Sequence, residues 1–107
     1  MGAERLKGNL DLLLLATVDA GEAHGYAIVE ALRRRSDGVF DLPEGTIYPA
    51  LHRLERAGWL RSLWREQEGR RRRVYQITAR GQRALGRQRE EWSVFARAVR
   101  AIAGGST

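Results

Sequence analysis

Residues 45–58, which read GTIYPALHRLERAG, decide the fold. Three apolar side chains in this stretch recur at helical spacing and predict a helix with one side turned to a core: Ile47, Leu51 and Leu54. Pro49 has no backbone N–H and is tolerated only in or near a first turn. The predicted helix therefore starts near Gly45-Thr46, with room for an irregular turn before it, and closes at Gly58.

The residues that follow predict a β-hairpin. Two β-prone segments, 59–65 and 72–78, flank a glycine turn at Glu68-Gly69-Arg70. Thr78 is then the expected N-cap of a long final helix over about residues 79–103.

Two helices are predicted upstream of the fold-deciding stretch. Residues 9–20 form the first, with Asn9 as its N-cap and Gly21 as its stop. The second begins at His24-Gly25-Tyr26 and runs to about Arg35. Three helices, a hairpin and a last helix give a winged helix-turn-helix, a mainly α fold with a small β-hairpin (α+β).

The basic residues are concentrated in one part of the chain. The 107 residues carry a formal net charge of +6, but residues 61–89 hold ten Arg against two Glu, a net of +8, and the remainder is slightly acidic. All but one of the 19 basic residues are Arg, whose planar fork suits phosphate and guanine. This distribution favours a polyanion, double-stranded DNA first, over a solvated Arg-rich surface.

The sequence offers no enzymatic or metal chemistry. The chain has no Cys, its two His lack metal-ligand spacing, and none of the nucleotide-binding or hydrolase motifs occurs, so no catalytic residue, metal or cofactor is expected. The longest apolar run, residues 12–16, is far shorter than the ~20 residues of a membrane span, and no secretion signal opens the chain. We expect a cytoplasmic protein that is not an enzyme and makes no membrane contact.

The outer face of the 45–58 helix and the hairpin tip are the expected DNA contacts. A helix in the major groove needs one side that packs and another that offers donors to phosphates and base edges. Four adjacent Arg at the hairpin return repel one another unless an anion relieves them, and about two of the four can face one side of a strand. The predicted DNA-contacting residues are Gly45, Thr46, Tyr48, Pro49, His52, Arg53, Arg56, Arg70, Arg71, Arg72 and Arg73.

The final helix carries a heptad pattern that a small filled core does not need. The first helix has a second apolar side, which must also be buried against another surface. Burial against a second copy satisfies both, and the alternative has the last helix fold back over its own domain. The predicted homodimer interface comprises Leu12, Leu15, Leu85, Gln88, Trp92, Phe95, Val99 and Ile102. Residues 1–78 would then form the DNA-binding domain, and residues 79–107 the dimerisation helix and a short flexible tail.

Several runs closely resemble the PadR family of winged-helix transcriptional regulators: His24-Gly25-Tyr26, then Gly45 to Leu51 with Arg53-Leu54-Glu55 and Gly58, and Gly69-Arg70-Arg71-Arg72 with Tyr75 and Thr78. The chain is similar to the short subfamily that ends in a single dimerisation helix. The resemblance implies a dimer that binds near-palindromic operators, most often as a repressor, with Tyr48, Pro49, Arg53 and the wing arginines toward DNA.

The resemblance also implies a small aromatic or multidrug-like effector at the dimer interface, against Trp92 and Phe95. The same two residues are explained equally well by packing between subunits. The alternative to a DNA-binding regulator is a winged-helix protein-protein interaction module without specific DNA binding, which the Arg-rich wing disfavours.

Overall fold

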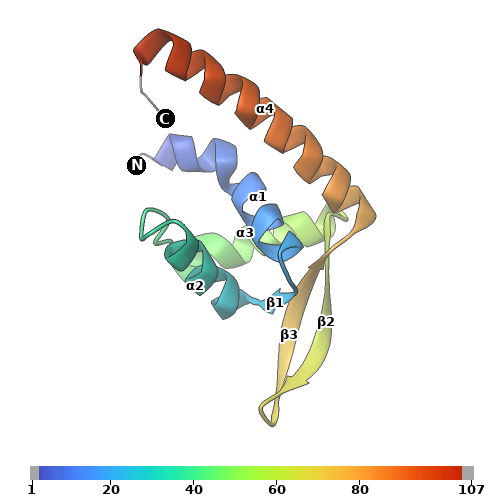
Figure 1. Ribbon diagram of the computed structural model, residues 1–107. Coiled ribbons are helices and arrows are strands. Elements are labelled where there is room, and N and C mark those ends of the chain that lie inside the picture. Colours follow the sequence, from blue (N-terminus) through green and yellow to red (C-terminus); the bar gives the residue numbers. More distant parts are fainter. Residues whose placement is uncertain (1–2, 105–107) are drawn as a thin grey trace.

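The computed structural model describes residues 3–104 and arranges them as four helices and a three-stranded sheet (Figure 1). The elements in chain order are α1 (Ala3–Asp19), β1 (Ala23–His24), α2 (Gly25–Arg35), α3 (Glu44–Arg56), β2 (Leu60–Gln67), β3 (Arg70–Ile77) and α4 (Ala79–Ala103). The winged helix-turn-helix fold is confirmed. The predicted flexible tail covers residues 104–107: Gly104 is the C-cap of α4, and residues 105–107 lie outside the described residues.

The predicted start of α1 is wrong, and α3 starts one residue before the predicted Gly45. α1 begins at Ala3, so Asn9 lies inside the helix and is not its N-cap. Residues 3–7 are helix formers, and one glycine after them costs only about 1 kcal/mol, so the helix continues through it. α3 begins at Glu44 with Pro43 as its N-cap, which places Pro49 in the second turn rather than in the first. A proline there cannot donate to the carbonyl of Gly45.

The other helix boundaries and the hairpin agree with the predictions. His24 is the N-cap of α2, and its Nδ1 accepts from the Ala27 N–H at 3.2 Å. Thr78 caps α4, and its Oγ1 accepts from the Gly81 N–H at 3.0 Å. The two-residue strand β1 was not predicted. It pairs with β3, with His24 opposite Val74, and places β3 in the centre of the sheet.

The core lies where α1 meets the other helices and β3. α1 contacts α2, α3, α4 and β3, and is therefore covered over more than one stripe of its surface. The fully buried large side chains include Leu14, Leu15, Ile28, Ile47, Leu51, Leu54, Leu60 and Leu85. The prediction that Leu15 and Leu85 lie at a dimer interface is wrong, because both are buried within a single chain.

Two elements project from this core (Figure 1). The β2–β3 hairpin extends away from the helices, and α4 runs over α1 toward the opposite end of the molecule. The radius of gyration is accordingly 15.0 Å, against about 13 Å for a compact domain of this length. The hairpin, which we call the wing, and the outer part of α4 are thus free for contacts with other molecules.

Candidate nucleic-acid interface

α3 separates a buried side from an exposed side. Ile47, Ala50, Leu51 and Leu54 are buried in the core. The residues of the opposite side that the sequence assigned to DNA are exposed: Gly45, Pro49, His52, Arg53 and Arg56. Thr46 and Tyr48 are half-buried at its edges. This helix can therefore present donors to a groove while it packs on the core.

Tyr48 is seated against the start of α2. A Cβ atom built on Gly25 would lie 2.6 Å from Cζ and 2.7 Å from Oη of Tyr48. Only glycine leaves room for the ring at this position, which gives a physical reason for the glycine of His24-Gly25-Tyr26. Burial raises the pKa of the Tyr48 phenol, so this hydroxyl remains a hydrogen-bond donor at neutral pH.

Arg53 is held by a carboxylate from α1. Its Nη2 donates to Oδ1 of Asp11 at 2.6 Å, and its Nη1 donates to Oδ2 at 3.1 Å. This two-point contact raises the pKa of Arg53 and fixes the plane of its guanidinium. Sequence analysis did not predict this pair, whose partners lie 42 residues apart.

The wing turns tightly at Glu68 and Gly69, whose φ angles are 52° and 74°. Left-handed conformations at both central positions are typical of a two-residue hairpin turn, and they agree with the register in which Gln67 faces Arg70. The strand period then places Arg71 and Arg73 on one face of the wing, and Arg70 and Arg72 on the other.

The first of these faces is continuous with α3. Arg73 donates from Nε to Oγ of Ser62 at 2.7 Å, and its Nη2 lies 3.3 Å from a carboxylate oxygen of Glu55. Ser62 in turn donates to the same oxygen of Glu55 at 2.6 Å. The guanidinium of Arg71 stacks at 5.0 Å over the ring of Trp64, which is 58% exposed. Sequence reasoning missed Trp64, because the cross-strand register alone brings it to Arg71.

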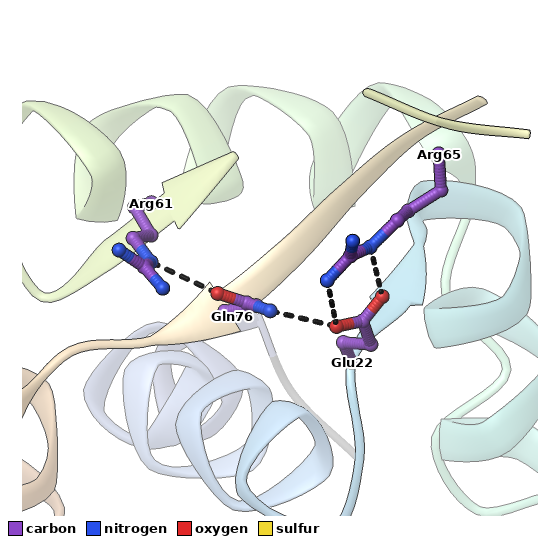
Figure 2. A network of polar contacts seen from close by, with 4 residues as sticks. All are labelled: Glu22, Arg61, Arg65 and Gln76. Carbon is purple, nitrogen blue, oxygen red and sulfur yellow. Dashed lines mark hydrogen bonds and ion pairs between the residues drawn. The ribbon is translucent and has the colours of Figure 1, made fainter. Parts of the chain in front are cut away.

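The opposite face holds a second polar network (Figure 2). Arg65 donates from Nε and Nη2 to the two oxygens of Glu22 at 3.0 and 3.2 Å. Gln76 donates to Glu22 at 2.7 Å and accepts from Nε of Arg61 at 2.9 Å. The bonds from Arg65 and Gln76 lower the pKa of Glu22 and keep it ionised. The network links the residue before β1 to both long strands, and so steadies the base of the wing.

An apolar stripe on α4 lies apart from these basic surfaces. The exposed large side chains of α4 are Trp92, Val94, Phe95, Val99 and Ile102, and Ile102 is 89% exposed. The rings of Trp92 and Phe95 lie 5.8 Å apart at a tilt of 39°. Beside them is an open groove of about 300 Å³ lined by Asn9, Leu12, Gln88, Glu91, Trp92 and Phe95. Within the described residues, the buried Oε1 of Gln88 accepts no hydrogen bond.

The part of the chain that the structure describes contains no cluster of three or more His, Asp or Glu able to hold a metal ion. None of the helices between residues 3 and 104 combines the length and apolar character that crossing a bilayer requires.

The fold and the paired basic surfaces of α3 and the wing define a winged helix-turn-helix protein. Residues 14–87 match the sequence family described as the transcriptional regulator PadR-like family. The chain belongs to this family and is therefore a transcriptional regulator, a role that implies regulation through DNA binding. The family is one of regulators rather than enzymes.

Individual relatives agree with this assignment. The chain is 41% identical over 78 residues to the transcriptional regulator Rv3488 of Mycobacterium tuberculosis, covering 73% of this chain and 70% of that protein. A PadR-like transcriptional regulator from Bacillus cereus superposes with a TM-score of 0.86 at 25% identity, over 97% of this chain and all of that one. A transcriptional regulator from Clostridium thermocellum gives 0.84 at 28% identity, over 94% and 98% of the two chains.

Proposed function

We propose that the protein is a homodimeric repressor that binds a near-palindromic operator through α3 and the wing. The observation that carries the proposal is that one small chain exposes two distinct surfaces, each of a kind that another molecule would contact. Exposed arginines lie on α3 and the wing, and an exposed apolar stripe lies on α4. The first surface fits a nucleic acid, and the second fits another copy of the same helix.

The DNA contacts follow from how the basic residues lie. The outer face of α3 would enter the major groove, and the wing would reach the neighbouring phosphates or the minor groove. Arg71 and Arg73 lie on the face that is bonded to α3 through Ser62 and Glu55, so this face of the wing is the better placed to contact the same duplex.

Dimerisation through α4 would remove the apolar stripe from water. Each Å² of apolar surface that is buried contributes about 25 cal/mol, and a two-fold axis lets each α4 cover the other. The predicted interface residues that remain outside the protomer core are Leu12, Gln88, Trp92, Phe95, Val99 and Ile102. Such a dimer would present two α3 helices to half-sites about 34 Å apart.

The groove beside Trp92 supports an effector site at this interface. A flat aromatic molecule could stack on Trp92 or Phe95, and a donor on that molecule could satisfy the Oε1 of Gln88. Occupation of the groove would change how the two α4 helices pack, and with them the distance between the two α3 helices.

Binding to duplex DNA at several salt concentrations tests the regulator and its wing. A protein that neutralises phosphates loses affinity as salt rises. The logarithm of its association constant falls with the logarithm of the salt concentration, with a slope of about 0.9 for each phosphate contacted. Replacing Arg71 and Arg73 together by Ala should flatten the slope by about 0.9 per subunit, because the charge of Arg73 is already offset by Glu55 and only Arg71 remains to displace counterions. The matched control replaces Arg97 and Arg100, two exposed arginines of α4, and should leave the slope nearly unchanged.

Selection of bound sequences from a random duplex pool then tests the operator. An enriched inverted repeat supports the dimeric repressor, and addition of aromatic ligands to the selected duplex tests release. Absence of binding to any duplex would refute the proposal and favour the protein-protein interaction module. Equal salt slopes for the Arg71/Arg73 variant and the Arg97/Arg100 variant would mean that this face of the wing does not contact DNA.

A further inference from the structure

The pair between Asp11 and Arg53 joins α1 to the helix proposed to read DNA. Both side chains are accessible to solvent, with Arg53 51% and Asp11 26% exposed. Ion pairs at such sites stabilise a fold by only about 0–1 kcal/mol, so the pair contributes little to folding. Its larger effect is on what Arg53 can offer to another molecule.

The contact with Asp11 leaves part of the guanidinium free. A guanidinium has five N–H groups, and Asp11 accepts through Nη1 and Nη2 of Arg53. The Nε–H and one further N–H on each Nη remain, and together Nε and one Nη form a second, side-on fork. Arg53 can therefore make a two-point contact with a phosphate or a guanine while it stays paired, but only on its Nε side.

The pair also removes most of the charge of Arg53 as a long-range attractor. The carboxylate lies 2.6 Å from Nη2, so the two opposite charges nearly cancel at a distance. Arbitrary duplex is held by phosphate charge, whereas an operator is held by oriented hydrogen bonds in addition. An arginine whose charge is neutralised but whose side chain is oriented therefore contributes more to affinity for the operator than to affinity for random DNA.

We propose that Asp11 is a positioning residue that sets DNA specificity: its two-point contact with Arg53 orients that side chain and cancels its charge, so that Arg53 favours a matching operator over arbitrary duplex. The inference rests on the proposed DNA-binding function and names an acidic residue outside the DNA-contacting set as a determinant of it.

The test compares Asp11→Asn with the matched variant Asp19→Asn. Both aspartates lie on α1 and both changes raise the net charge by the same amount, but Asp19 pairs with Arg89 of α4 at 3.7 Å rather than with α3. Each variant is measured on the wild-type-selected duplex and on random duplex over a range of salt, and circular dichroism confirms that both variants fold.

Asp11→Asn should release Arg53 to phosphates. We expect tighter binding to random duplex and a salt slope steeper by about 0.9 per subunit, or about 1.8 for the proposed dimer, which changes the affinity roughly sixtyfold for each tenfold change in salt. The ratio of operator to random affinity should fall at least roughly fivefold, because an arginine fork discriminates bases by about 1–3 kcal/mol. Asp19→Asn should leave this ratio unchanged, and Asp11→Asn should have no effect on it once Arg53 is replaced by Ala.

Three outcomes overturn the inference. Equal slopes and equal ratios for the two variants would mean that Asp11 does not act through Arg53. If Asp11→Asn raised the affinity for operator and random duplex equally, Asp11 would act only as a negative charge that weakens all DNA binding. Wild-type protein that binds neither duplex refutes the proposed function itself, and the inference falls with it.

Discussion

Replacing Gly81 by Ala should destabilise the protein, although alanine is ordinarily the better residue in a helix by about 1 kcal/mol. The new Cβ would overlap the carbonyl oxygen of Trp59 and lie 2.8 Å from Cγ1 of Ile77. That carbonyl belongs to the backbone and accepts from the Thr78 N–H at 3.1 Å, so it cannot swing aside as a side chain would. Overpacking of this kind costs about 1–3 kcal/mol.

The overpacking term exceeds the gain in helix propensity, so a net loss of about 1–2 kcal/mol is expected. In a chain of this length that corresponds to a fall in Tm of roughly 5–15 °C. Thermal unfolding followed by circular dichroism measures it, at one fixed protein concentration because dimerisation, as proposed above, would make the Tm depend on concentration.

Gly86 of the same helix provides the control for Gly81. It is exposed, and a Cβ built on it meets nothing within 4 Å, so Gly86→Ala should stabilise by about 0.5–1 kcal/mol. Opposite signs for two identical substitutions in one helix can arise only from the surroundings. A gain in Tm for Gly81→Ala similar to that for Gly86→Ala would refute the reasoning, and would mean that α4 does not pack tightly on Trp59, the residue before the wing.

Other positions give shorter tests. Gly25→Ala should displace the Tyr48 ring and weaken DNA binding roughly fivefold, as expected for one lost contact of about 1 kcal/mol, and titration of labelled duplex would measure it. Phe95→Glu should yield monomers at micromolar concentration in sedimentation velocity, and persistent dimers would place the interface elsewhere. Burial and the charge of Arg72 lower the pKa of His24, so the unfolded chain binds the proton first and stability should drop as the pH falls below about 6.5. Urea unfolding at pH 7.5 and 5.5 checks this, and His24→Asn, which retains a capping side chain, should show a smaller drop.

The elements that could be predicted are those whose signals are local. Thr78 accepts from an N–H three residues on, so the start of α4 is encoded within one turn. The wing likewise follows from a turn at Glu68-Gly69 between two β-prone segments. The outer residues of α3 were predictable as well, because helical spacing alone divides its two faces.

The features that could not be predicted depend on distant segments. β1 is only two residues long and exists because it pairs with β3, about 50 residues later. The interface role predicted for Leu15 and Leu85 was wrong for a similar reason. α1 is apolar on more than one side, and only its packing shows that Leu15 is buried within the chain. Leu85 shares its heptad stripe with the exposed Trp92 and Val99, and the heptad pattern does not show that Leu85 is covered within the chain. The carboxylates that hold the arginines are equally remote, at separations of 42 and 43 residues.

These pairings change how the basic charge should be counted. Of the ten arginines in residues 61–89, four lie on α4, and Arg65 and Arg73 pair with Glu22 and Glu55 at 3.0 and 3.3 Å. A paired guanidinium still donates hydrogen bonds, but it adds little net charge with which to displace counterions. Within the described residues, Arg61 and residues 70–72 form no ion pair, so the wing should contribute a salt slope of about 3.6 per subunit, whereas ten free arginines would give about 9. We therefore expect the paired arginines to act on DNA through the orientation of their hydrogen bonds, and the unpaired ones at the wing tip through charge attraction.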